Sequence, residues 1–132
     1  MVKKVLLIED DEFIRDLYKR QLDKGGFFTY AFSNGEEGLK SIEDNRYDLI
    51  LLDIMLPGMN GLDILRNIKQ NDATKDIPVI MLSNLGQDAV IREGLVLGAI
   101  GYLIKPSFTP NQIVQEIKAI LEQQGESQSS AS

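Results

Sequence analysis

The chain of 132 residues contains no cysteine and no histidine. The absence of cysteine excludes a disulfide, a thiolate nucleophile and a zinc site with thiolate ligands. The absence of histidine removes imidazole as a metal ligand and as a general base. Catalysis by a Ser-His-Asp or Cys-His arrangement is therefore excluded.

Positive charge and long apolar runs are also scarce. The chain has 14 basic and 20 acidic residues, a net charge of −6, and no long basic run. Direct binding of nucleic acid through its phosphates is therefore not expected. No apolar stretch approaches the length of a transmembrane helix, and residues 1–4 run directly into a strand-like segment. We expect a cytoplasmic protein that contacts neither nucleic acid nor a membrane.

The hydrophobic content of 43% over this length predicts one domain with a substantial core. Short apolar runs alternate with longer segments of helical periodicity, which is typical of an α/β fold. Most of the predicted strands lack polar alternation, as in a parallel sheet covered by helices on both faces. The strands are predicted near residues 4–8, 28–32, 48–52, 78–82 and 101–104.

The last residues differ from the rest in composition. From Gly125 they are small and polar and offer no apolar side chain to bury. We expect the domain to span residues 1–124, and residues 125–132 to be a disordered tail, the remnant of a linker or a cloning scar.

Chemically useful side chains lie at the ends of four of the predicted strands. The first strand ends in Glu9 and Asp10, the third in Asp53, the fourth in Ser83 and the fifth in Lys105. Each could alone be a helix cap or a solvated side chain. Ligands of open parallel sheets bind at the carboxyl ends of the strands, however, so the convergence favours a site. Carboxylates there suit Mg2+, and an amine with a hydroxyl suits a phosphoryl group.

At these positions the sequence resembles the receiver domain of two-component response regulators, from residue 3 to about residue 122. The resemblance rests on four motifs: Leu-Leu-Ile-Glu9-Asp10-Asp-Glu, Leu-Leu-Asp53-Ile-Met-Leu-Pro-Gly, Val-Ile-Met-Leu-Ser83-Asn and Gly-Tyr-Leu-Ile-Lys105-Pro. It implies a flavodoxin-like, doubly wound sheet of five parallel strands in the order 2-1-3-4-5, with five helices.

The resemblance also implies roles for individual residues. Asp53 would accept a phosphoryl group from a sensor histidine kinase or a histidine phosphotransfer protein, assisted by Lys105 and Ser83. Mg2+ would be held by Glu9, Asp10, Asp53 and the backbone carbonyl of Met55. Ser83 and Tyr102 would form the switch, and the bond before Pro106 would be cis. Such a protein signals to a downstream partner, which the sequence leaves unknown, and is not an enzyme.

Partner contacts are expected on the first helix and on the loop after the fifth strand. The residues concerned are Ile14, Arg15, Leu17, Tyr18, Ser107 and Phe108. The dipeptide Ile100-Gly101 stands where receivers of winged-helix transcription factors usually carry an acidic pair for dimer salt bridges. This departure favours a stand-alone receiver or another output class.

Other protein classes fit these residues less well. A degenerate receiver could act as an interaction module without phosphorylation, but the complete set of site residues opposes that hypothesis. A haloacid-dehalogenase-like phosphatase would need a second aspartate two positions after a nucleophile at the end of the first strand. A flavodoxin-type electron carrier would need a loop rich in serine, threonine and glycine there, whereas this chain has Glu9-Asp10-Asp11-Glu12.

Overall fold

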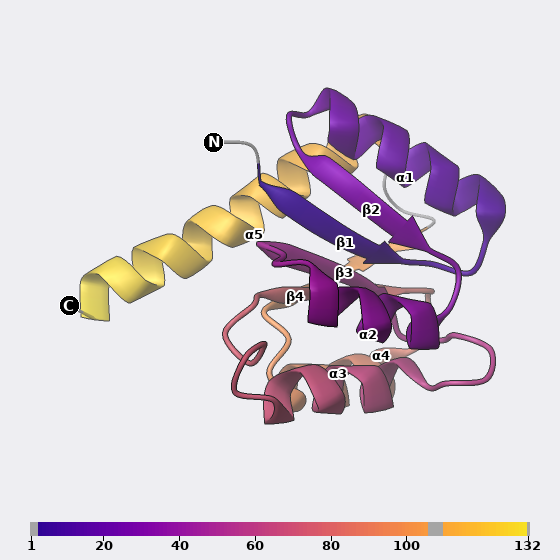
Figure 1. Ribbon diagram of the computed structural model, residues 1–132. Coiled ribbons are helices and arrows are strands. Elements are labelled where there is room, and N and C mark those ends of the chain that lie inside the picture. Colours follow the sequence, from indigo (N-terminus) through magenta and orange to yellow (C-terminus); the bar gives the residue numbers. More distant parts are fainter. Residues whose placement is uncertain (1–2, 106–109, 132) are drawn as a thin grey trace.

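The computed structural model describes the backbone of residues 3–105 and 110–131, and the side chains of residues 3–105 and 112–123. These residues form one parallel sheet in the order β2-β1-β3-β4-β5 (Figure 1). The strands are β1 (Lys4–Ile8), β2 (Phe28–Phe32), β3 (Leu49–Asp53), β4 (Val79–Ser83) and β5 (Gly101–Ile104). The helices are α1 (Glu12–Lys24), α2 (Gly35–Asp44), α3 (Gly61–Gln70), α4 (Asp88–Leu97) and α5 (Pro110–Ala131). The predicted fold class and strand order are thereby confirmed.

Helices cover both faces of the sheet, and alternate strand residues supply the two cores. Leu6 and Ile8 of β1 pack toward α2, α3 and α4, whereas Val5 and Leu7 pack toward α1 and α5. Figure 1 shows these two helical layers on opposite sides of the strands. All five residues of β3 and of β4 are buried. The continuous apolar runs of these strands reflect burial on both faces.

Two strands extend one residue further than their apolar runs predict. Asp53 pairs in register with Leu82, and Ser83 pairs with Ile104. Asp53 and Ser83 are thus the last residues of β3 and β4. The backbone ladder continues past the apolar run because its hydrogen bonds do not depend on side-chain type.

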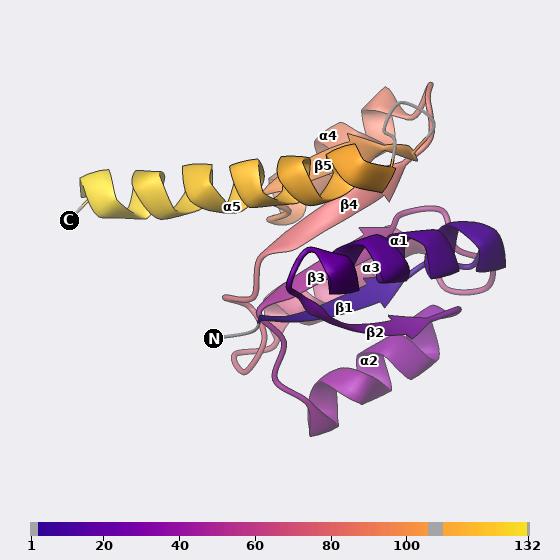
Figure 2. The same cartoon turned by 90° about the horizontal axis from the view of Figure 1, so that it is seen from above.

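The C-terminal segment differs from the expected irregular tail. Helix α5 continues through Gly125 to Ala131, and Figure 2 shows its end extending well beyond the strands. The backbone hydrogen bonds of a helix are internal, so a helix can continue where no apolar side chain is available for packing. A polar composition predicts the loss of packing and not the loss of helix. No helix in the described part of the chain combines the length and the apolar character needed to cross a membrane.

Candidate functional site

One lysine joins two acidic residues at the carboxyl ends of the central strands. Lys105 Nζ lies 2.9 Å from Glu9 Oε1 and 3.0 Å from Asp53 Oδ2. Glu9 directly follows β1, Asp53 ends β3 and Lys105 follows β5, so residues far apart in the sequence meet at one edge of the sheet. Glu9 and Asp53 are buried, and only 9% of the Lys105 side chain is exposed. The sequence-predicted cluster is thus assembled in the structure.

Asp10 completes an acidic triad with Glu9 and Asp53. One carboxylate oxygen from each of the three residues lies within 4.8 Å of the other two. Asp10 is exposed, whereas its two neighbours are buried. Three carboxylates beside one ammonium leave an excess of negative charge, and their hard oxygen atoms are the ligands that divalent cations such as Mg2+ prefer. The triad therefore fits a metal ion.

The protonation of the cluster follows from its burial and pairing. Burial raises the pKa of Glu9 to about 8, and the hydrogen bond with Asp53 adds to this effect while Lys105 opposes it. Burial alone would lower the pKa of Lys105, but its hydrogen bonds with Glu9 and Asp53 outweigh burial and raise it. Lys105 therefore stays charged at neutral pH and compensates the Asp53 carboxylate, while the Glu9 carboxyl group keeps its proton until the pH rises through about 8.

Two side chains hold the loop after β1 in place: that of Asp11, the N-cap of α1, and that of Arg15 in the first turn of α1. Asp11 accepts a hydrogen bond from the Ile14 N–H at 3.0 Å and so caps α1, which agrees with its omission from the predicted metal ligands. Arg15 donates from one nitrogen to the carbonyl oxygens of Glu9 at 3.0 Å and Asp10 at 3.3 Å. Sequence reasoning assigned Arg15 to partner binding and missed this support, because a charged residue in a first helical turn carries no sign of its contact.

The loop after β3 brings the backbone toward Asp53. The Met55 N–H donates to Asp53 Oδ1 at 2.9 Å. A side chain at Gly61 would place its Cβ 2.6 Å from the Asp53 carbonyl oxygen and 2.4 Å from Ile54 Cα. Only glycine permits this approach of α3 to the end of β3. The Met55 carbonyl as a metal ligand remains a prediction.

The two expected switch residues adopt different positions. Ser83 is buried, and its hydroxyl donates to Gln87 Oε1 at 2.8 Å. Tyr102 lies on β5 with 45% of its surface exposed. Sequence reasoning missed Gln87, because nothing in its spacing from Ser83 distinguishes it from an ordinary residue at a helix start.

Some predicted partner residues are placed differently from expectation. Tyr18 is only 3% exposed and packs in the core between α1 and α5, so its prediction as a partner contact is wrong. Phe13, five positions earlier on α1 and not among the predicted partner contacts, is 74% exposed. Helical spacing alone does not separate the buried and exposed faces of a helix start. Pro106, Ser107 and Phe108 lie outside the described residues.

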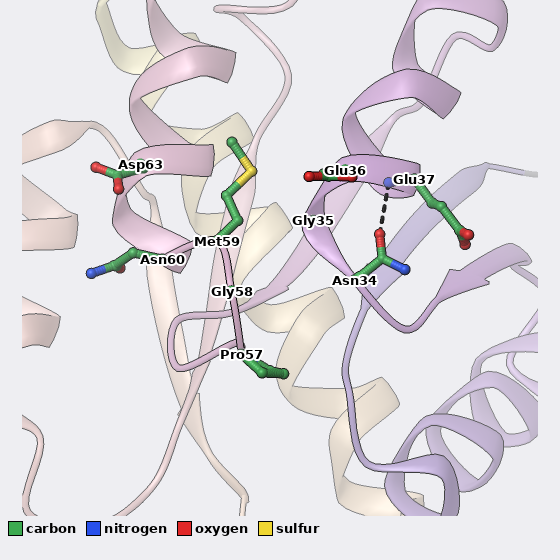
Figure 3. Close-up of a pocket in the computed structure, with 9 residues that line it drawn as sticks. All are labelled: Asn34, Gly35, Glu36, Glu37, Pro57, Gly58, Met59, Asn60 and Asp63. Carbon is green, nitrogen blue, oxygen red and sulfur yellow. Dashed lines mark hydrogen bonds between the residues drawn. The ribbon is translucent and has the colours of Figure 1, made fainter.

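A hollow of about 730 Å³ contains none of the residues of the cluster. It separates the starts of α2 and α3, and Figure 3 shows Glu36 and Glu37 on one side and Asp63 on the other. The Asn34 side chain faces its own helix, since its Oδ1 accepts from the Glu37 N–H at 2.9 Å. The hollow is lined by Asn34, Gly35, Glu36, Glu37, Pro57, Gly58, Met59, Asn60 and Asp63. Its carboxylates do not meet, so the acidic triad is the candidate site.

Comparison with known proteins agrees with this site. The family described as the response regulator receiver domain matches residues 5–118. The phosphate regulon transcriptional regulatory protein PhoB of Pseudomonas aeruginosa is 39% identical over 99% of this chain and 57% of its own length. The chain spans about half the length of the curated relatives that it matches. Such relatives include transcriptional regulators despite the departure at Ile100-Gly101.

Solved structures share both the fold and sequence features. The chemotaxis response regulator CheY4 of Vibrio cholerae superposes with a TM-score of 0.84 at 27% identity, covering 91% of this chain and 99% of that one. The BeF3-activated DrrB receiver domain superposes with a TM-score of 0.79 at 30% identity, covering 92% and 99%.

The family match covers β2 to β5, all of β1 except Lys4, and the acidic cluster. The structure brings Glu9, Asp10 and Asp53 together and joins Lys105 to Glu9 and Asp53, whereas Ser83 ends β4 and contacts Gln87. The chain belongs to the response regulator receiver domains, which are phosphoacceptor signalling domains of two-component systems and not enzymes.

Proposed function

We propose that Asp53 accepts a phosphoryl group from a sensor histidine kinase or a histidine phosphotransfer protein, and that this modification switches the domain. The observation that carries the proposal is the buried Asp53 carboxylate, held 3.0 Å from Lys105 beside two further carboxylates. Burying such a cluster is costly, so its presence at a strand end indicates chemical use.

The contacts of Asp53 suit a nucleophile. The Met55 N–H holds Oδ1, and the flexible side chain of Lys105 reaches Oδ2. In the proposed reaction an Asp53 oxygen attacks phosphorus, the P–N bond to the donor imidazole breaks, and its electron pair stays on nitrogen. The product is an acyl phosphate. A carboxylate nucleophile needs no general base, which agrees with a chain that lacks histidine.

Mg2+ is the proposed metal of the acidic triad. Asp10, Asp53 and the Met55 carbonyl would contact the ion, and Glu9 would hold a water of its shell. The bound ion supplies positive charge beside the phosphoryl oxygens. Lys105 supplies a second positive charge, and Ser83 can donate one hydrogen bond.

The contact surface for the kinase is proposed from the exposure of side chains on α1. Ile14 and Leu17 of α1 are half-buried near the site, and the neighbouring Phe13 is largely exposed. We assign kinase contact to this part of α1. The downstream partner remains unassigned, because the transcriptional activity of relatives such as PhoB belongs to proteins about twice as long.

Labelling with acetyl phosphate tests the function. Wild type with Mg2+ should gain one phosphoryl group by intact mass, and Asp53→Asn should gain none. Asp63→Asn is the matched control, because Asp63 is an exposed acid that pairs with Arg66 away from the triad. Equal labelling of Asp53→Asn and wild type would refute the assignment.

A further inference from the structure

The connection between β4 and α4 contains a side chain that turns back on the strand. Gln87 Oε1 accepts two hydrogen bonds, from the Ser83 hydroxyl at 2.8 Å and from the Asn84 N–H at 2.8 Å. The Ser83 hydroxyl also lies 3.1 Å from the Asn84 carbonyl oxygen. Ser83 is only 1% exposed, so its hydroxyl is satisfied by this loop and not by water.

The N-cap of α4 differs from the N-caps of α1, α2 and α3 in the hydrogen bonds that its side chain makes. Gln87 is the N-cap residue of α4, yet its side chain makes no capping hydrogen bond. The N-cap side chains of α1, α2 and α3 all accept a hydrogen bond from their own helix. Gly86, at a φ of 86°, provides the backbone conformation in which the next side chain can return to β4. The Gln87 amide thus serves Ser83 and not α4.

The Ser83 hydroxyl has a single proton to donate. Asp53 lies on the adjacent strand, in register with Leu82, the residue before Ser83. If Ser83 donates to a phosphoryl group on Asp53, it must give up its hydrogen bond to Gln87. The two hydrogen bonds are therefore alternatives, and whatever stabilises one opposes the other.

We propose that Gln87 is a positioning residue that holds Ser83 in the unphosphorylated conformation and so opposes phosphorylation. The inference rests on the proposed function, because it requires a phosphoryl group at Asp53. The loss of one net hydrogen bond corresponds to about a twofold to tenfold change in an equilibrium constant. Removing the Gln87 amide should strengthen binding of a phosphoryl analogue by that factor.

The test is a titration of beryllofluoride in excess Mg2+, followed by the amide NMR signals of α4. Gln87→Met should bind about twofold to tenfold more tightly than wild type, and Gln87→Ala should shift the affinity in the same direction. Gln115→Met is the matched control, since Gln115 is an exposed glutamine on α5, and it should bind as wild type does.

A double variant separates positioning from a general effect on the loop. In the Ser83→Ala background, Gln87→Met should leave the affinity unchanged, because the hydroxyl on which it acts is gone. Unchanged or weaker beryllofluoride binding by both Gln87 variants would overturn the proposed role of Gln87 and leave the proposed function of Asp53 intact. Failure of wild type to bind beryllofluoride would instead overturn the proposed function, and the role of Gln87 with it.

Discussion

Lys105 donates from Nζ to Asp53 Oδ2 over 3.0 Å, although 52 positions separate the two residues in the chain. The same ammonium also reaches Glu9. One cation therefore joins the buried side chains of Glu9, which follows β1, and Asp53, which ends β3.

Replacement of Lys105 by methionine should destabilise the metal-free protein at pH 8 by about 3 kcal/mol, because it leaves the buried Asp53 carboxylate without a counter-charge. Urea unfolding in the presence of a chelator measures the loss. Lys75→Met is the control, since Lys75 pairs with Asp72 at the surface and should change stability by less than about 0.5 kcal/mol. Equal stability of Lys105→Met and wild type at pH 8 would show that the pairing contributes nothing.

The raised pKa of Glu9 predicts a dependence of stability on pH. Burial raises this pKa from 4.5 to about 8, so the folded protein binds a proton that the unfolded chain has already lost. The resulting stabilisation is complete below pH 4.5 and is lost as the pH rises through about 8. Glu9→Gln resembles the protonated form at every pH. Relative to Glu9→Gln, metal-free wild type should lose more than about 1 kcal/mol between pH 5 and pH 8.

The same proton links metal binding to pH. Carboxylate ligands must be deprotonated to interact with a cation, so Mg2+ binding near pH 7 should release a proton. Isothermal titration calorimetry in two buffers of different ionisation enthalpy measures this release. Glu9→Gln should release less, and equal proton release by both proteins would contradict the assignment of the raised pKa to Glu9.

Strand identity could be predicted because the core is built from uninterrupted apolar runs such as residues 49–52 and 79–82. The family resemblance supplied the strand order, whereas the meeting of Glu9, Asp53 and Lys105 was predicted from the rule that ligands bind at the carboxyl ends of parallel strands. The last residue of a strand was harder to predict from an apolar run, because backbone pairing includes the polar residues Asp53 and Ser83 in β3 and β4. Composition also failed at Gly125, where the α5 backbone remains helical.

Contacts made by loop conformations could not be predicted. Arg15 binds two backbone carbonyl groups, and Gln87 turns back to Ser83, yet neither contact has a sequence period. The 45% exposure of Tyr102 likewise could not be predicted from the type of the residue.

Ser83→Ala should separate phosphorylation from the conformational response. The variant retains Asp53, the triad and Lys105, so acetyl phosphate should still label it. It lacks the hydroxyl that can donate a hydrogen bond to the phosphoryl group. The changes in NMR chemical shift of residues 90–97 and 113–117 on phosphorylation should therefore be smaller than in wild type. Full wild-type shifts in the labelled variant would refute this coupling.

Truncation after Gln124 should leave the stability of the domain within about 0.5 kcal/mol of the full chain, because the removed residues contain no large apolar side chain. Thermal unfolding of both chains makes the comparison. A larger loss would show that the end of α5 packs on the domain and would move the predicted domain boundary.

The central claim is that Asp53 is the phosphoacceptor and that the acidic triad works with Mg2+. Its most direct test is peptide mapping of the modified residue by mass spectrometry, after wild type is treated with acetyl phosphate in Mg2+ or in a chelator. We expect one phosphoryl group, on Asp53, with Mg2+ and none with the chelator. Modification at another residue, or equal modification of Asp53 without the metal, would contradict it.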